Sequence, residues 1–177
     1  FEKTNGYCTD VFFAKATAWM EQKIAAHEPF YLHLATNAPH APYNARPEDA
    51  ALYLKQTRTA DVANFFGMIH NIDENVGKLL ARLDALGIAD NTIVIFMNDN
   101  GTANGQSVFN AGMRGAKGTA FLGGTRAMAF WRWPHHFTPH EVKALTEHID
   151  FFPTICELTG QPLNRLGFGK VPQRTSG

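Results

Sequence analysis

Residues 92–101 read T-I-V-I-F-M-N-D-N-G, an apolar run that ends in a cluster of oxygen-bearing side chains. The β-branched and aromatic residues from Thr92 to Met97 predict a short strand that is buried on both faces. Polar side chains at the carboxyl end of such a strand lie where open α/β sheets bind their ligands. Asp99 and Asn100 are therefore the first candidates for chemistry in this chain.

A long helix is predicted immediately before this strand, because apolar residues recur at intervals of three and four from Val62 to Leu86. Residues 30–36 (F-Y-L-H-L-A-T) form a second short apolar run, which we interpret as another buried strand. The order strand, helix, strand is typical of a βαβ unit, in which the two strands run parallel as neighbours or near neighbours. The predicted fold class is α/β.

The predicted strand at residues 30–36 leads into N-A-P-H-A-P-Y, residues 37–43. Pro39 and Pro42 fix the backbone on either side of His40 and disfavour a helix, so the imidazole should lie on a stiff loop. Because the strands of a βαβ unit are parallel, this loop and Asp99 should lie at the same edge of the sheet. His40 is a candidate functional residue, and an ordinary loop residue is the alternative.

Residues 102–124 are rich in glycine and contain Arg114 and Lys117. Closely spaced glycines let the backbone approach an anion, and the two cations would supply charge. The Walker phosphate loop does not match, because no G-K-[ST] follows a glycine and four spacer residues. From the residues alone, a flexible surface loop remains the alternative.

The remaining elements are predicted from caps and periodicity. They are a helix over residues 10–26 capped by Thr9, a polar surface connection with one helical turn over 46–57, a strand over 127–133, a short helix from 138–141 toward His148, and a helix after Asp150 that ends at Gly160. Residues 161–177 should form a loose C-terminal tail, because they are rich in Gly, Pro and Arg.

The composition fits a folded globular protein, with 45% hydrophobic and 18% charged residues in 177 residues. The 16 basic and 16 acidic residues balance, so no nucleic-acid partner is indicated. No apolar run is long enough for a membrane span. Cys8 and Cys156 predict no disulfide framework. Four histidines, at positions 135, 136, 140 and 148, have no metal-ligand spacing with acids, so we expect surface or capping roles for them.

Six segments, taken in order, resemble the sulfatase family. They are G-Y-C-T-D (6–10), P-F-Y-L-H-L-A-T-N-A-P-H-A-P-Y (29–43), I-D-E-N-V-G-K-L-L-A-R-L (72–83), N-T-I-V-I-F-M-N-D-N-G (91–101), R-G-A-K-G-T (114–119) and I-D-F-F-P-T-I-C-E-L-T-G (149–160). The resemblance implies an alkaline-phosphatase-like fold, with a mostly parallel sheet flanked by helices. Residues 1–160 would then be part of the sulfatase catalytic α/β domain, with the fold incomplete.

The resemblance also implies roles for the candidate residues. Asp99 and Asn100 match an Asp-Asn pair that helps to bind a divalent cation, usually Ca²⁺, and carboxylate and amide oxygens suit that ion. His40 and Lys117 match residues that contact the sulfate group and support its departure. The physical chemistry agrees, because Lys117 would neutralise sulfate oxygens and His40 could protonate the leaving oxygen.

The chain departs from the family pattern at the nucleophile, a formylglycine made from Cys or Ser in a C/S-x-P/A-x-R motif. Neither Cys8, Cys156, Ser107 nor Ser176 lies in such a motif. Leu122 also replaces an acid that commonly precedes Gly-Gly. We therefore expect an internal or truncated piece of a sulfatase, without activity by itself.

The expected complete protein is a sulfuric ester hydrolase of arylsulfatase type, acting on a small sulfate ester or a sulfated glycan. One alternative is a phosphonate or phosphate ester hydrolase of the same superfamily, although Asn100 favours sulfate because such relatives tend to carry His there. Another is a non-catalytic sulfatase-like binding domain. Unpaired strand edges in an incomplete sheet also predict self-association of the chain.

Overall fold

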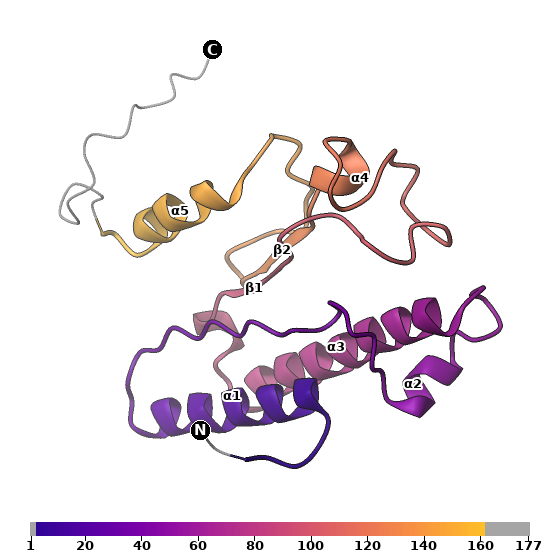
Figure 1. Ribbon diagram of the computed structural model, residues 1–177. Coiled ribbons are helices and arrows are strands. Elements are labelled where there is room, and N and C mark those ends of the chain that lie inside the picture. Colours follow the sequence, from indigo (N-terminus) through magenta and orange to yellow (C-terminus); the bar gives the residue numbers. More distant parts are fainter. Residues whose placement is uncertain (1–2, 162–177) are drawn as a thin grey trace. The chain divides into compact units, whose positions relative to one another are not determined.

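The computed structural model describes residues 3–161, and contacts divide the chain into one unit that ends at Thr138 and another that begins at Pro139. Figure 1 traces the elements in chain order. The first unit contains α1 (Cys8–Ala25), α2 (Pro47–Ala51), α3 (Ala60–Ala85), η1 (Ala89–Asn91), β1 (Val94–Met97), α4 (Leu122–Thr125) and β2 (Ala129–Arg132), and the second contains η2 (His148–Asp150) and α5 (Phe151–Leu158). The expected domain over 1–160 stays a prediction, and the expected tail falls outside the described residues beyond Gln161.

Helix α3 confirms the long helix predicted from periodicity. The side chain of Thr59 caps it, because its Oγ1 accepts a hydrogen bond of 3.3 Å from the N–H of Val62. Helix α1 packs along α3 (Figure 1), and Met20 of α1 joins Leu83 of α3 and Ala89 in one buried cluster. These two helices therefore form the main apolar layer of the first unit.

Helix α1 confirms the predicted helix but begins earlier than expected. Its N-cap is Tyr7, and no side chain caps the first turn. Thr9, the predicted cap, instead lies inside the helix and is almost completely buried, together with Phe13 and Ala16. The cap prediction was wrong because the buried stripe of α1 begins at Thr9, and the helix must therefore include it.

Strands β1 and β2 confirm the central parts of two predicted strands. They pair antiparallel, with Val94 opposite Arg132 and Met97 opposite Ala129. The sheet in the described residues consists of this one antiparallel pair, so the expected parallel partner at residues 30–36 is not present as a strand.

Residues 30–36 are extended but unpaired. Half-buried and exposed residues alternate along them, yet no backbone hydrogen bond within residues 3–161 links them to another segment. The strand prediction was wrong because an alternating pattern specifies an extended conformation with one buried face, whereas a strand also needs a hydrogen-bonded neighbour.

Residues 30–38 and β1 nevertheless contact the same two apolar clusters, and they do so in the same order along the chain. Phe30 and Val94 both pack on the cluster around Leu83. Ala38 belongs to a second cluster on α3, against which Phe96 of β1 packs. The loop after Ala38 and the segment after Phe96 are therefore brought toward the same end of β1.

The second unit contains the predicted helix after Asp150 but not the one predicted from residue 138. Helix α5 includes Pro153 in its first turn, and Gly160 follows it with φ of 68°. Residues 139–147 form no helix, because their apolar side chains are solvent-exposed, Leu145 to 84%, and bury no face. The capping box lies instead at η2, where the N–H of Glu147 donates to Asp150 Oδ2 at 2.8 Å.

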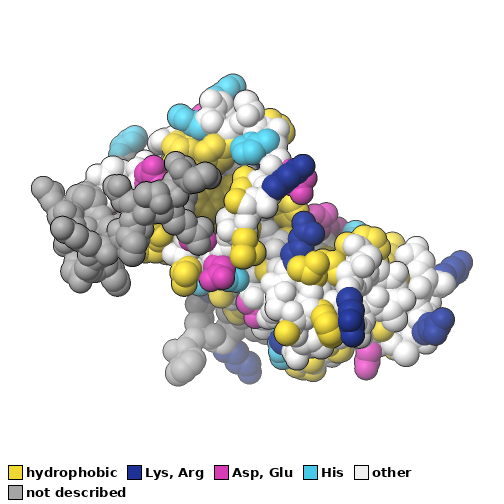
Figure 2. Space-filling view, turned by 90° about the horizontal axis from the view of Figure 1, so that it is seen from above, with side chains coloured by type: hydrophobic (Ala, Val, Ile, Leu, Met, Phe, Trp, Pro, Cys, Tyr) yellow, Lys and Arg dark blue, Asp and Glu magenta, His cyan; other side chains and the backbone are white. Residues whose placement is uncertain are grey.

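Several large hydrophobic side chains remain exposed, as the yellow atoms in Figure 2 illustrate for one face. Tyr31 in the extended segment is 71% exposed, and Phe130 in β2 is 64% exposed. Within residues 3–161, no helix combines the length and apolar character needed to cross a membrane.

Candidate functional site

The carboxyl end of β1 is held in place by the side chain of Asn98. Its Oδ1 accepts a hydrogen bond of 2.8 Å from the N–H of Met128, and its Nδ2 donates to the carbonyl oxygen of Asn100 at 2.6 Å. Asp99 is exposed and Asn100 is half-buried. The two candidate oxygen ligands therefore follow a fixed strand end, and Asp99 faces solvent.

Backbone hydrogen bonds close the glycine-rich loop on itself and onto this strand end. The N–H of Gly101 donates to the carbonyl oxygen of Gly124 at 2.9 Å, and that of Lys117 donates to Thr102 at 2.8 Å. Within the loop, the N–H of Gly123 donates to Arg114 at 2.8 Å. The loop is therefore closed on itself and on the segment after Asp99, while most of its residues are exposed.

The glycines are required by close approach of the backbone. A Cβ atom on Gly101 would overlap the carbonyl oxygen of Gly123. One on Gly124 would overlap the carbonyl oxygens of Ala116 and Thr119. Any side chain at these positions would push the strand end and the loop apart.

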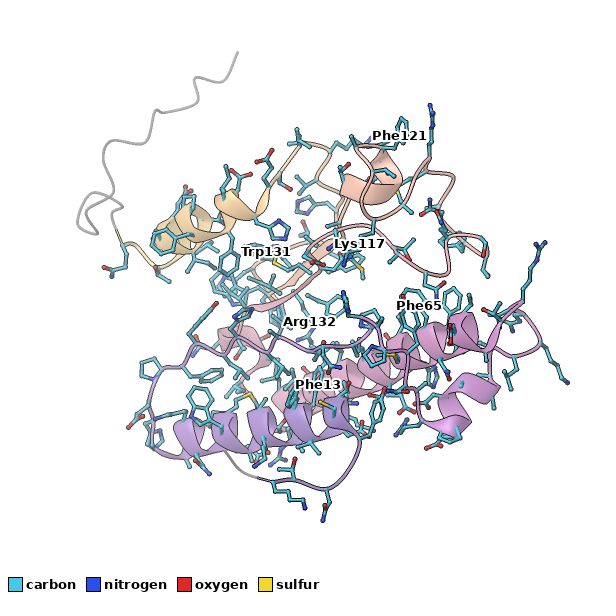
Figure 3. The ribbon with its side chains drawn as sticks, viewed as in Figure 1. Phe13, Phe65, Lys117, Phe121, Trp131 and Arg132 are labelled. Carbon is cyan, nitrogen blue, oxygen red and sulfur yellow. The ribbon has the colours of Figure 1, made fainter. Side chains whose placement is uncertain are left out.

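The two cations of the loop have different surroundings. The guanidinium of Arg114 lies 3.8 Å from the ring centroid of Phe121, a cation–π contact inside the loop. Lys117 is exposed, and no ion pair is recorded for it within the described part of the chain. Figure 3 shows Lys117 on the side of the loop nearer the strands and Phe121 on the side away from them. Lys117 is therefore the cation better placed to meet an anion beside Asp99.

The side chain of His40 is oriented by its own loop. Its Nδ1 lies 2.9 Å from the carbonyl oxygen of Ala41. Because a carbonyl oxygen can only accept, Nδ1 carries the hydrogen of this bond, and Nε2 is left for another partner. The backbone N–H of His40 donates to Asn37 at 2.8 Å, and the residue is exposed.

The fold brings the four predicted residues toward one end of β1. Lys117 is linked through Thr102 to the segment that holds Asp99 and Asn100. His40 follows Ala38 by two residues, and Ala38 lies in the cluster against which Phe96 packs. The His40 loop, the Lys117 loop and the segment with Asp99 and Asn100 therefore lie toward the same end of β1.

These residues fit a hard divalent cation only in part. A carboxylate and an amide offer three oxygens at most, whereas Ca²⁺ takes six to eight. Within residues 3–161, no group of three or more His, Cys, Asp or Glu side chains converges. Asp99 and Asn100 can therefore contribute to a cation site, and further ligands would have to complete it.

An ion-pair cluster around Arg46 was not predicted from the sequence. The segment 46–57 was expected to be a polar surface connection, and α2 confirms its single helical turn. Yet Asp49 is only 3% exposed and pairs with Arg46. One sequence feature could have predicted this ion pair. Pro47 follows Arg46 at the first position of a helix, and the helical turn brings Asp49 next to Arg46.

This cluster shifts the pKa values of Arg46 and Asp10. The pKa of Arg46 is raised, chiefly by its hydrogen bond to Asp49. Burial opposes this rise but is outweighed. Burial alone would raise the pKa of Asp10, but hydrogen bonds from Asn75 and Asn71 together with the charge of Arg46 outweigh burial and lower it. Both groups are therefore held in their charged forms.

The histidines near the end of β2 have the surface roles expected for them. His135 Nε2 lies 3.5 Å from Asp90 Oδ2. The ring of His136 stacks on Trp133 with centroids 3.9 Å apart.

Comparisons with known proteins place this geometry in context. The model of the Sulfatase family matches residues 1–161. The chain is 32% identical over 157 residues to the uncharacterized sulfatase YdeN of Escherichia coli K12, covering 86% of this chain and 27% of the relative. It is 34% identical over 158 residues to the N-acetylgalactosamine-6-sulfatase of Homo sapiens, covering 86% and 28%.

The fold also matches a crystal structure, that of Ps i-CgsB in complex with k-i-k-neocarrahexaose. The TM-score is 0.80 at 31% identity, over 93% of this chain and 37% of that one. This likeness confirms the predicted alkaline-phosphatase-like α/β fold, of which the described residues show a part. The chain spans about a third of the length of the relatives that it matches.

Proposed function

Because the chain belongs to the sulfatase family, we propose that it is part of a sulfuric ester hydrolase of arylsulfatase type, whose complete form hydrolyses sulfate monoesters. The observation that carries the proposal is the backbone link from Lys117 to Thr102, which ties a cation to the segment that follows Asp99 and Asn100. An anion bound there would meet the ammonium group and the strand end together.

Each candidate residue has one role in this proposal. Lys117 neutralises the charge on the sulfate oxygens, where a fixed cation stabilises the transition state more than it stabilises the substrate. His40, held by Ala41 through Nδ1, acts from Nε2 as the imidazolium. As the bond between sulfur and the leaving oxygen breaks, the proton on Nε2 passes to that oxygen.

The expected chemistry also requires two groups that His40 and Lys117 do not provide, a divalent cation and the nucleophile. A divalent cation such as Ca²⁺, when bound, would polarise the sulfate oxygens, and formylglycine would supply the nucleophile. Asp99 and Asn100 would hold part of that cation's ligand shell. A C/S-x-P/A-x-R motif in the remainder of the protein would provide the formylglycine.

The proposed substrate class is a sulfated sugar. By its name, the similar human protein is an N-acetylgalactosamine-6-sulfatase, and the similar crystal structure is in complex with k-i-k-neocarrahexaose. A small aryl sulfate would present the same sulfate group to Lys117 and is a convenient probe.

Two other functions are distinguished by specific observations. A phosphate or phosphonate ester hydrolase would prefer a dianionic phosphate probe over a sulfate, and Asn100 favours sulfate. A non-catalytic sulfatase-like domain would bind a sulfate ester without any C/S-x-P/A-x-R motif in the complete protein.

Nuclear magnetic resonance (NMR) titration of the labelled 177-residue chain with 4-nitrophenyl sulfate tests the proposal. We expect shifts at the His40 ring and the Lys117 ammonium, with loss of the response in Lys117→Met. Lys55→Met is the matched control, because Lys55 is an exposed lysine after α2. A stronger response to 4-nitrophenyl phosphate would favour the phosphate alternative, and no response at either residue would overturn the proposal.

A further inference from the structure

We propose that Arg46 is a positioning residue for His40. Its ion pairs with carboxylates hold the C-terminal end of the His40 loop (residues 37–46) against three helices. The inference rests on the proposed role of His40, but the position of the loop can be measured independently of that role.

The upstream end of the His40 loop is anchored by apolar packing. Ala38 is 7% exposed and belongs to the cluster with Met68 and Ile72 of α3. Thr36 Oγ1 donates a hydrogen bond of 2.9 Å to the carbonyl oxygen of Ala38. This end needs no charged partner, because burial already holds it.

The middle of the loop is bounded by neutral contacts. The ring of Tyr43 meets that of Phe65 edge to face, with centroids 5.9 Å apart. The hydroxyl of Tyr7 donates to the carbonyl oxygen of Asn44 at 2.9 Å. The N–H of Asn44 donates to Pro42 at 3.0 Å. These contacts hold residues 42–44. The C-terminal end of the loop is held by Arg46.

Arg46 fixes that end through a two-point ion pair. Its Nε lies 2.7 Å from Asp49 Oδ2, and its Nη2 lies 2.9 Å from Asp49 Oδ1. Two parallel hydrogen bonds set the plane of the guanidinium as well as its position. Because the carboxylate of Asp49 is buried, this pair is shielded from solvent.

Arg46 Nε also lies 3.6 Å from Glu48 Oε1 of α2, and two further contacts reach other helices. Nη2 also donates to Glu74 Oε2 of α3 at 2.8 Å, and Nη1 donates to Asp10 Oδ2 of α1 at 3.4 Å. Asp10 is held in turn by the side chains of Asn71 and Asn75, at 2.8 and 2.7 Å. One guanidinium therefore fixes the end of the loop relative to α1, α2 and α3.

A displacement of Arg46 should reach His40 because the chain between them is stiff. Pro39 and Pro42 restrict the backbone on both sides of His40. Ala45 also has restricted freedom to move, because it packs on the same cluster as Ala38. A shift at residue 46 would therefore move the imidazole instead of being absorbed by the loop.

Arg46→Lys tests the inference while keeping the charge. A lysine ammonium cannot make the two parallel bonds to Asp49 and also reach Glu74 and Asp10. We expect amide hydrogen exchange at His40 and Asn44 to accelerate about tenfold, an opening free energy lower by about 1.4 kcal/mol. Amides in the middle of α3 should be unchanged. Arg58→Lys, at an exposed arginine after α2, should alter neither set.

Two further measurements separate positioning from general stability. In Arg46→Lys, the NMR response of the His40 ring to 4-nitrophenyl sulfate should fall while that of Lys117, on the other loop, persists. Glu74→Gln removes the negative charge of one partner and spares the buried Asp49, so it should accelerate exchange at the same two amides by about twofold to threefold.

The possible results differ for the two proposals. Unchanged exchange at His40 and Asn44 in Arg46→Lys, or equal loss of protection throughout α1 and α3, would overturn the positioning role. Accelerated exchange at these two amides, in a chain whose His40 ring never responds to the ester, would support the anchoring of the loop by Arg46 and overturn the proposed function of His40.

Discussion

The N–H of Gly101 donates a hydrogen bond of 2.9 Å to the carbonyl oxygen of Gly124. This bond joins the end of β1 to the end of the glycine-rich loop. Because the two chains touch backbone to backbone, neither position has room for a side chain. The proximity of Lys117 to the Asp99 segment depends on this contact.

Gly101→Ala should therefore destabilise the protein by overpacking, by about 1–3 kcal/mol in the free energy of unfolding. Its Cβ would overlap the carbonyl oxygen of Gly123. Gly112→Ala is the control, since Gly112 has φ of 71° but open space around its Cβ, so only the cost of the left-handed backbone, about 1 kcal/mol, is expected. Urea unfolding followed by circular dichroism measures both, and a smaller effect at Gly101 than at Gly112 would contradict the contact.

Substitution of two glycines of α3 should give opposite signs. A Cβ on Gly67 would lie 2.8 Å from the backbone nitrogen of Ala50 and 2.9 Å from the Cβ of Ala45, so Gly67→Ala should force α2 away and destabilise by about 1–3 kcal/mol. Gly77 is exposed with nothing within 4 Å, so Gly77→Ala should stabilise by about 0.5–1 kcal/mol. Effects of the same sign in urea unfolding would show that α2 does not pack on α3 at Gly67.

Stability should fall in acid as Asp10 becomes protonated. Its pKa is lowered in the folded protein, against the tendency of burial, by Asn75, Asn71 and Arg46. A lowered pKa means a stabilising contribution that is complete above the unfolded value of about 4 and is lost as pH falls through the folded value. In Asp10→Asn, the loss of stability below about pH 4 should be smaller than in the parent chain.

The control for that measurement is Asp73→Asn, which removes an exposed carboxylate of α3. Its unfolding midpoint should follow the parent chain at every pH. Identical acid profiles for Asp10→Asn and the parent chain would mean that the Asp10 interactions do not contribute to stability.

The 177-residue chain should not hydrolyse 4-nitrophenyl sulfate. It contains no C/S-x-P/A-x-R motif, and Asp99 and Asn100 would supply only part of the proposed cation site. Release of 4-nitrophenol with and without added Ca²⁺ measures this. Hydrolysis above the buffer rate that disappears in Asp99→Ala would prove the prediction wrong.

The chain should self-associate through the extended segment at residues 30–36. Its backbone groups lack a hydrogen-bonded neighbour within residues 3–161, and Tyr31 exposes 71% of its surface. Such an edge pairs readily with another chain, whereas a charged side chain opposes pairing. Light scattering should show oligomers that Tyr31→Lys reduces in size.

Leu145→Lys is the matched control for association, because Leu145 is even more exposed but lies in a stretch of the second unit that forms neither helix nor strand. It should leave the oligomers unchanged. A monodisperse monomer of the parent chain would count against association altogether, and equal effects of both lysines would indicate nonspecific adhesion.

Local sequence patterns predicted most of the helices and both strands. The periodicity from Val62 to Leu86 gave α3, because its apolar face recurs within the helix itself. The run from Thr92 to Met97 and the polar residues after it located β1 and the candidate ligands. The family resemblance, carried by short segments in a fixed order, was confirmed by the match over residues 1–161.

Residues 30–36 are an exception, because local pattern did not decide their structure. Their alternating pattern correctly indicated an extended chain with one apolar side. Whether such a chain becomes a strand depends on a partner elsewhere, and residues 3–161 provide none that bonds to it. The short helix predicted from residue 138 failed similarly, because no surface covers a helix there.

The sequence by itself determined the residue types of the candidate site, the two prolines that flank His40 and the strand that precedes Asp99. Only the tertiary structure decided that the glycine loop closes on Gly101 and that Arg46 joins three helices. The physical reason is distance along the chain. Periodicity and caps are set by residues a few positions apart, whereas Gly101 with Gly124 and Arg46 with Glu74 meet only after the helices have packed.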